Sequence, residues 1–152
     1  MPFADLPAAV PAGQESRVDG RAAGGDRTAQ ELSRAECLRL LRTTGVGRLV
    51  YTDRALPAII PVNFVITDDH VVVALRNGSR AAQAANGNVV AFEADRIDEE
   101  TRTGWSVVVV GPGVAERVGT TDVLLRSWIT GERDVRLLIA LQRVTGRRLL
   151  SA

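Results

Sequence analysis

Residues 61–80 read Pro-Val-Asn-Phe-Val-Ile-Thr-Asp-Asp-His-Val-Val-Val-Ala-Leu-Arg-Asn-Gly-Ser-Arg, and this segment decides the fold. Because side chains alternate along a strand, its first half predicts a strand with Val62 and Phe64 on one face and Asn63 on the other. The two aspartates that follow predict a turn. The valine-rich residues 70–76 predict a second, largely buried strand. The segment therefore predicts an antiparallel pair of strands that leads into a loop.

The loop after this pair predicts an anion site. Asn77-Gly78 alone is typical of a hairpin turn, but the residues from Ala81 to Ala85 are alanine-rich helix formers. Ser79 is therefore predicted as the N-cap of a short helix. Backbone N–H groups, the Ser79 hydroxyl and the Arg80 guanidinium then come together, and such an arrangement suits a phosphate.

Composition limits the class of protein. A chain of 152 residues, 45% of them hydrophobic, fits one domain with a proper core. Nineteen basic and 18 acidic residues give a net charge of +1, which argues against a nucleic-acid partner. The single Cys37 excludes an intramolecular disulfide, and with the single His70 it argues against a metal site.

The sequence gives no sign of a membrane partner or of export. No apolar run reaches the roughly 20 residues that a transmembrane helix needs. The amino terminus lacks a charged region followed by an apolar core, so the cytoplasm is the expected compartment. Residues 1–31 are rich in Pro, Gly, Ala and charge, and we expect them to form a flexible tail before a domain over residues 32–152.

The rest of the chain predicts a mainly β fold with a few short helices. Ser33 and Glu36 form a capping box, which predicts a helix over residues 33–44. A second helix is expected over residues 121–129. Strands are predicted at 46–52, 56–67, 70–76, 89–95, 104–111 with a continuation over 114–118 past a Gly-Pro-Gly bulge or bend, 135–141 and 144–150. Six or seven strands at this spacing are typical of a barrel or sandwich.

Six short motifs occur in an order that resembles the pyridoxamine 5′-phosphate oxidase-like family. They are Leu32-Ser-Arg-Ala-Glu-Cys-Leu38, Val46-Gly-Arg-Leu49, Pro61-Val-Asn-Phe64, Val90-Ala-Phe-Glu93, Thr101-Arg-Thr-Gly-Trp-Ser-Val107 and Val144-Thr-Gly-Arg-Arg148. The resemblance covers about Leu32 to Leu150. It implies a split β-barrel of six to seven antiparallel strands that binds FMN at a homodimer interface.

The resemblance also implies where the cofactor lies. The strand of residues 61–64 would follow the isoalloxazine ring, and the loop of residues 76–80 would hold the ribityl phosphate. Trp105 and Ser106 would lie near the flavin, from the partner subunit. The implied cofactor-binding residues are Pro61, Val62, Asn63, Phe64, Arg76, Ser79, Arg80, Trp105 and Ser106. No catalytic residue is identified.

Two positions depart from the pattern of the vitamin oxidases. Those enzymes carry two adjacent basic residues in the phosphate loop, whereas here Arg80 is followed by Ala81. They also carry an Arg and a His in the carboxy-terminal segment that meet the substrate, and residues 146–150 contain no His. The departures argue against vitamin oxidation and leave the small-molecule substrate unknown.

Each site residue also has a purely structural interpretation. Asn63 fits a buried amide satisfied by the backbone, and Arg80 fits a solvated residue at a helix start. Arg76 fits a surface ion-pair partner, and Trp105 fits core or interface packing. Glu93 is expected to pair with a basic residue on a neighbouring strand.

The leading functional hypothesis is a homodimeric, FMN-dependent oxidoreductase. One alternative is a deazaflavin-dependent reductase of the same fold, with Arg17, Arg21 and Arg27 as basic contacts. Another is a non-catalytic protein that binds a flavin, or haem through His70. A third is a structural dimer with an empty cleft.

Overall fold

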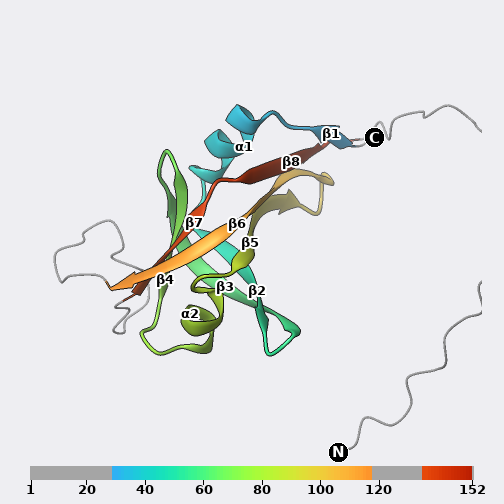
Figure 1. Ribbon diagram of the computed structural model, residues 1–152. Coiled ribbons are helices and arrows are strands. Elements are labelled where there is room, and N and C mark those ends of the chain that lie inside the picture. The colour runs from blue at the N-terminus through green and yellow to red at the C-terminus, as the bar shows by residue number, and fades with distance from the viewer. Residues whose placement is uncertain (1–28, 118–134, 152) are drawn as a thin grey trace, which may run out of the picture.

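The computed structural model describes residues 29–117 and 135–151, and this part of the chain is mainly β (Figure 1). Two short helices accompany eight strands. The elements are β1 (Ala29–Glu31), α1 (Arg34–Leu41), β2 (Val46–Asp53), β3 (Leu56–Ile66), β4 (His70–Leu75), α2 (Arg80–Ala85), β5 (Val89–Asp98), β6 (Thr103–Arg117), β7 (Val135–Ala140) and β8 (Arg143–Leu149).

Six of these strands close an antiparallel barrel. The order is β6-β5-β2-β3-β4-β7, and β7 pairs back with β6, while β8 and β1 extend the sheet outward from β6. Closure depends on the length of β6, which pairs with β5 up to Pro112, with β8 up to Val110 and with β7 from Gly113 to Arg117. The Gly-Pro-Gly break predicted at residues 111–113 does not end the strand. Strand β6 continues through it and changes its pairing partners there. A Cβ at Gly111 would collide with the Ala140 carbonyl oxygen, so only glycine allows this approach.

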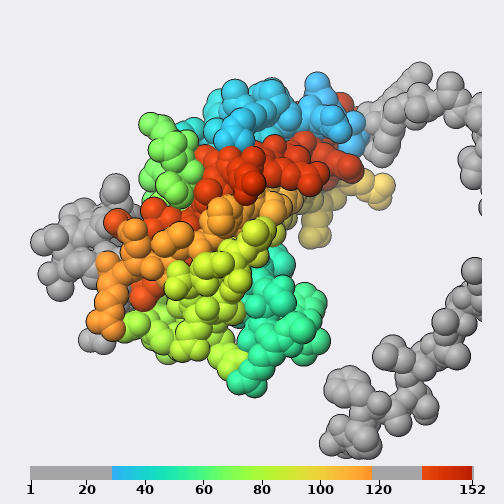
Figure 2. All heavy atoms as spheres, in the orientation of Figure 1, coloured from blue at the N-terminus to red at the C-terminus, as the bar shows by residue number. Residues whose placement is uncertain are grey.

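The inward faces of the barrel strands and one side of each helix form the core. Phe92, Leu49, Leu137 and Ile139 are fully buried near its centre, as the period of two requires. Figure 2 shows α1 packed along β8. Cys37 of α1 faces Gly146 of β8, and burial raises the pKa of its thiol, which fits the predicted role as a small core hydrophobe.

The local signals for helix starts are confirmed. Ser33 caps α1 in a capping box with Glu36, and hydrogen bonds from the Ser33 hydroxyl and backbone lower the pKa of the Glu36 carboxyl. Ser79 caps α2, because its Oγ accepts a hydrogen bond from the Ala82 backbone N–H at 3.2 Å. No helix of the described residues is long and apolar enough to cross a membrane.

Two boundaries differ from the prediction. The sequence analysis assigns residues 29–31 to the tail, but they form β1, which pairs Ala29 with Leu149 and Glu31 with Arg147 and adds one strand to those expected. Strand β5 runs on to Asp98, over the start of the predicted connector. Residues 1–28 and the predicted helix at 121–129 lie outside the described residues.

Candidate functional site

Strand β3 divides the predicted flavin contacts between two faces. Val62 and Phe64 point into the barrel and belong to the core, and the Phe64 ring packs against Phe92 with centroids 4.6 Å apart. Pro61 and Asn63 lie on the outer face, as the alternation predicts. A ligand on the outer face would meet these two side chains, and it would meet Val62 and Phe64 through backbone groups alone.

Asn63 carries an unsatisfied donor. Its side-chain Nδ2 is buried and has no hydrogen-bond partner among the described residues. Leaving a buried amide N–H unpaired costs about 1–3 kcal/mol. The purely structural interpretation expected the backbone to satisfy this buried amide, and it does not do so at Nδ2. A planar ligand with carbonyl oxygens or ring nitrogens at its edge supplies the missing acceptor, so the residue fits a flavin.

A charged cluster lies on the same outer face. Arg48 of β2 pairs with Glu93 at 3.0 Å and with Asp95 at 3.6 Å, which confirms the predicted cross-strand partner of Glu93. In the register, Arg48 stands between Pro61 and Glu93. Burial is the largest cause that raises the pKa of Glu93. The neighbouring Asp95 raises it further, as an acceptor for the protonated carboxyl and through its negative charge, and Arg48 offsets only part of this rise. The cluster therefore places a carboxyl with a raised pKa in the register row of Pro61, two strands away from β3.

The predicted phosphate loop is held by a residue that the sequence did not indicate. Arg80 Nη2 donates to Asp53 Oδ1 at 2.7 Å and Oδ2 at 2.9 Å, and Arg80 Nε donates to Asp53 Oδ2 at 3.1 Å. These hydrogen bonds, and then the charge of Asp53, raise the pKa of Arg80. Arg80 is thus an ion-pair partner, rather than the solvated helix-start residue of the structural interpretation. Arg76 is exposed after β4 and does not join this pair.

A polar hollow of about 340 Å³ lies beside the Arg80–Asp53 pair. It is bounded by the β2–β3 hairpin and by the outer side of α2, which packs its buried Ala81, Ala82 and Ala85 toward the core. The residues that line it are Thr52, Asp53, Arg54, Arg80, Gln83, Ala84 and Asn88. Of the two residues Ser79 and Arg80 of the predicted phosphate loop, Arg80 lines this hollow and Ser79 does not.

Trp105 and Ser106 point to opposite sides of β6. Trp105 is 7% exposed and packs in the core, as its structural interpretation predicted. Ser106 faces outward and lines a second hollow of about 500 Å³, together with Glu31 and Leu32 beside β8 and with Val108, Arg143, Val144, Thr145, Gly146 and Arg147. Thr145 and Arg147 stand directly across from Val108 and Ser106 in the β6–β8 register.

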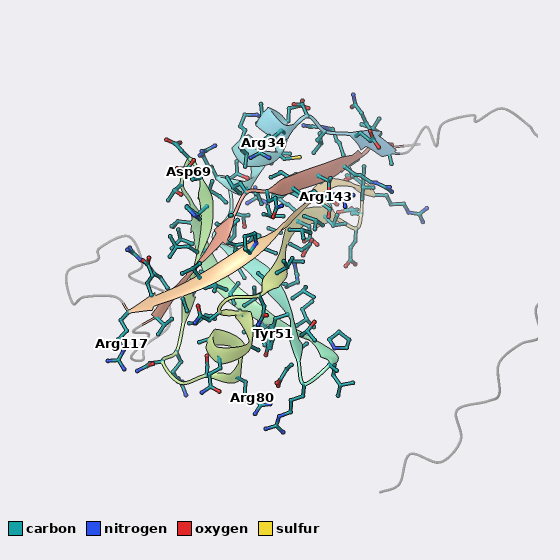
Figure 3. All side chains as sticks on the ribbon, in the orientation of Figure 1. Arg34, Tyr51, Asp69, Arg80, Arg117 and Arg143 are labelled. Carbon is teal, nitrogen blue, oxygen red and sulfur yellow. The ribbon has the colours of Figure 1, made fainter. Side chains whose placement is uncertain are left out.

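Within one chain, the predicted contacts do not all meet. Asn63 on β3 and Ser106 on β6 share an outer face but are three strand spacings apart, about 14 Å. Figure 3 places Arg80, which lines one hollow, in the lower part of the molecule and Arg143, which lines the other, in the upper part. The resemblance assigns Ser106 to the partner subunit, and this separation is compatible with that assignment.

Comparisons with known proteins agree with this architecture. The profile of the family described as pyridoxamine 5′-phosphate oxidase matches residues 33–148. The chain belongs to the pyridoxamine 5′-phosphate oxidase-like family. Within this family it is 39% identical over 134 residues to the uncharacterized protein Rv0080 of Mycobacterium tuberculosis, a match that covers 82% of this chain and 88% of the relative.

Solved structures of the family share the fold. The FAD binding protein of Mycobacterium smegmatis is 32% identical, with a TM-score of 0.63 over 80% of this chain and 99% of that one. A conserved protein of unknown function from Corynebacterium diphtheriae, DIP1874, is 30% identical, with a TM-score of 0.61 over 81% of this chain and 99% of that one. The family and the barrel fold are therefore established.

Proposed function

We propose that the protein is a homodimeric flavoprotein that binds FMN and acts as an oxidoreductase on a small molecule. The single observation that carries this proposal is the buried Nδ2 of Asn63 without an acceptor, on the strand that the family lays along the flavin ring. A bound flavin supplies hydride and electron transfer, so the protein needs only to bind, orient and shield it.

The described residues would divide this task. Asn63 donates a hydrogen bond to an acceptor at the edge of the ring, and its donor is already desolvated. Arg80 holds the phosphate through a charge-assisted hydrogen bond. Glu93, whose pKa is raised, lies on the same outer face in the register row of Pro61, two strands away, and would hold a proton beside a ring that extends across β2. No metal is needed for this role, and the described residues contain no cluster of three or more potential metal ligands.

FAD is the second candidate cofactor. The protein of Mycobacterium smegmatis that is 32% identical is described as FAD binding. The open hollow beside Arg80 leaves room beyond a phosphate held there. No described residue favours a deazaflavin, since the arginines at 17, 21 and 27 lie outside the described residues. Titration of the ligand-free protein with FMN, FAD and riboflavin separates these cofactors.

The proposal makes opposite predictions for binding and stability at Asn63. Asn63→Leu removes an unpaired buried donor at nearly constant size, so the free energy of unfolding should rise by about 1 kcal/mol in the ligand-free protein. The same change should weaken FMN binding about tenfold, because one desolvated hydrogen bond is lost. Urea unfolding and flavin fluorescence titration measure the two effects. Gln142→Leu, which alters an exposed amide in the β7–β8 connection, should change neither; loss of stability in Asn63→Leu contradicts the proposal.

The proposed dimer covers the outer face of the extended sheet. Ile59 and Val46 are 61% and 51% exposed there, and Val50, Val108 and Val110 are half-buried on neighbouring strands. The family implies a dimer, and an obligate interface should bury more than about 2,000 Å² in total. A partner laid on this face would also bring its own Ser106 toward Asn63.

The dimer is tested by placing a charge on each of two exposed apolar positions. Sedimentation at low micromolar concentration should give twice the chain mass of 16.3 kDa. Ile59→Asp should give monomers, because it buries a carboxylate in the interface. Val114→Asp makes the same change at a residue 52% exposed on the β7-paired part of β6, and it should remain a dimer. A monomeric wild-type protein would contradict both the proposed dimer and the proposed site shared between subunits.

A further inference from the structure

Arg80 already holds an anion that belongs to the chain itself. Two oxygens of Asp53 accept three hydrogen bonds from its guanidinium, at 2.7, 2.9 and 3.1 Å. The two residues are 27 positions apart and come from different elements. A guanidinium binds carboxylate and phosphate with the same fork of N–H groups. The carboxylate of Asp53 therefore occupies the donors that a phosphate would use.

The local backbone fixes both members of this pair. Asp53 ends β2 directly before a two-residue turn, in which Arg54 and Ala55 both have positive φ angles of 51° and 64°. Such a turn allows little freedom at the strand end. Arg80 follows the N-cap Ser79, and α2 packs its alanines against the barrel. The contact between Asp53 and Arg80 is thus built by two rigid elements rather than by two free side chains.

We propose that Asp53 competes with the terminal phosphate of the flavin for Arg80, and so sets how strongly the site prefers FMN to riboflavin. This proposal rests on the proposed function. A phosphate monoester carries a charge of about −1.5 to −2 at pH 7. To reach the donors of Arg80 it must displace the Asp53 carboxylate, and the two negative charges then repel each other. With Asp53 present, Arg80 and Asp53 together present almost no net charge. The phosphate group therefore adds less to the free energy of FMN binding than it would beside an arginine without an ion-pair partner.

Two other roles for Asp53 predict different results. If Asp53 orients Arg80 toward the phosphate, removal of its charge weakens FMN binding. If the pair only ties the hairpin to α2, removal of the charge lowers stability and leaves the relative affinity for FMN and riboflavin unchanged. Competition alone predicts that FMN binds more tightly without the carboxylate. The sign of one change in affinity therefore separates the three roles.

The test uses Asp53→Asn in the full chain, with FMN and riboflavin titrated against the ligand-free protein. FMN affinity should rise about five- to tenfold, as expected when a charged competitor leaves a charge-assisted site, and riboflavin affinity should not change. Asp53→Ser should also raise FMN affinity. Agreement between the two variants would exclude a defect that is specific to one of them. Asp69→Asn makes the same charge change in the exposed β3–β4 turn, and it should leave both affinities unchanged.

A double-mutant cycle locates the effect at Arg80. In an Arg80→Ala background, Asp53→Asn should give a clearly smaller gain in FMN affinity, because it removes only the repulsion between carboxylate and phosphate and releases no guanidinium. An equal gain in that background, or an unchanged or lower FMN affinity in the single Asp53 variants, would overturn the competition while leaving flavin binding in place. If the wild-type protein binds neither FMN nor riboflavin, the proposed function fails, and the competition fails with it.

Discussion

Arg80→Ala should weaken FMN binding by about ten- to a hundredfold and leave riboflavin binding nearly unchanged. Arg80 and Arg54 both line the polar hollow between the β2–β3 hairpin and α2, and Arg80 is the one that directly follows the helix N-cap Ser79. Riboflavin lacks the phosphate, so its affinity reports general damage to the site. Equilibrium titration of both flavins, followed by fluorescence, measures the difference directly.

Two variants accompany this measurement. Arg39→Ala removes an equal charge from the exposed side of α1 and should alter neither affinity. Ser79→Ala should cost about 1 kcal/mol of stability through the lost helix cap, with a smaller loss of FMN affinity than Arg80→Ala. Equal weakening of FMN and riboflavin by Arg80→Ala would show that Arg80 is not the phosphate ligand.

Phe92→Ala should lower the free energy of unfolding by about 3–5 kcal/mol, because it empties the centre of the barrel. Phe92 is fully buried, packs against Phe64, and lies so close to Gly47 that even a Cβ there would collide with its ring. Urea unfolding of the ligand-free protein measures the loss. Phe92→Leu keeps most of the volume and should cost less than half as much. A loss below about 1 kcal/mol would contradict the position of Phe92 in the core.

Local sequence signals accounted for most of the fold. The capping box at Ser33 and the N-cap at Ser79 depend on a few neighbouring residues, and both are confirmed. The alternation in residues 59–66 also placed Val62 and Phe64 on one face and Asn63 on the other, and the structure turns the first of these faces toward the core. Strand β1 could not be predicted because Ala29–Glu31 has no apolar pattern. These residues form a strand through their pairing with β8. The partner change of β6 likewise depends on closure of the barrel, although Gly111 is what allows the close approach to Ala140 there.

The site was less accessible to prediction than the fold. Arg80 was identified from its place after Ser79, but its partner Asp53 lies 27 residues away in a hairpin, and no local pattern connects them. Trp105 and Ser106 were treated as one contact, although the period of two already requires them to face opposite sides of β6. The unpaired Nδ2 of Asn63 depends on the packing around one side chain and is visible only in three dimensions.

The central claim is that two copies of this chain bind two molecules of FMN. A native mass spectrum of the full chain, recorded after addition of FMN at low micromolar concentration, tests it most directly. The predicted result is a single species with the mass of two 16.3 kDa chains and two FMN molecules. A monomer, or a dimer that takes up no FMN, would contradict the account.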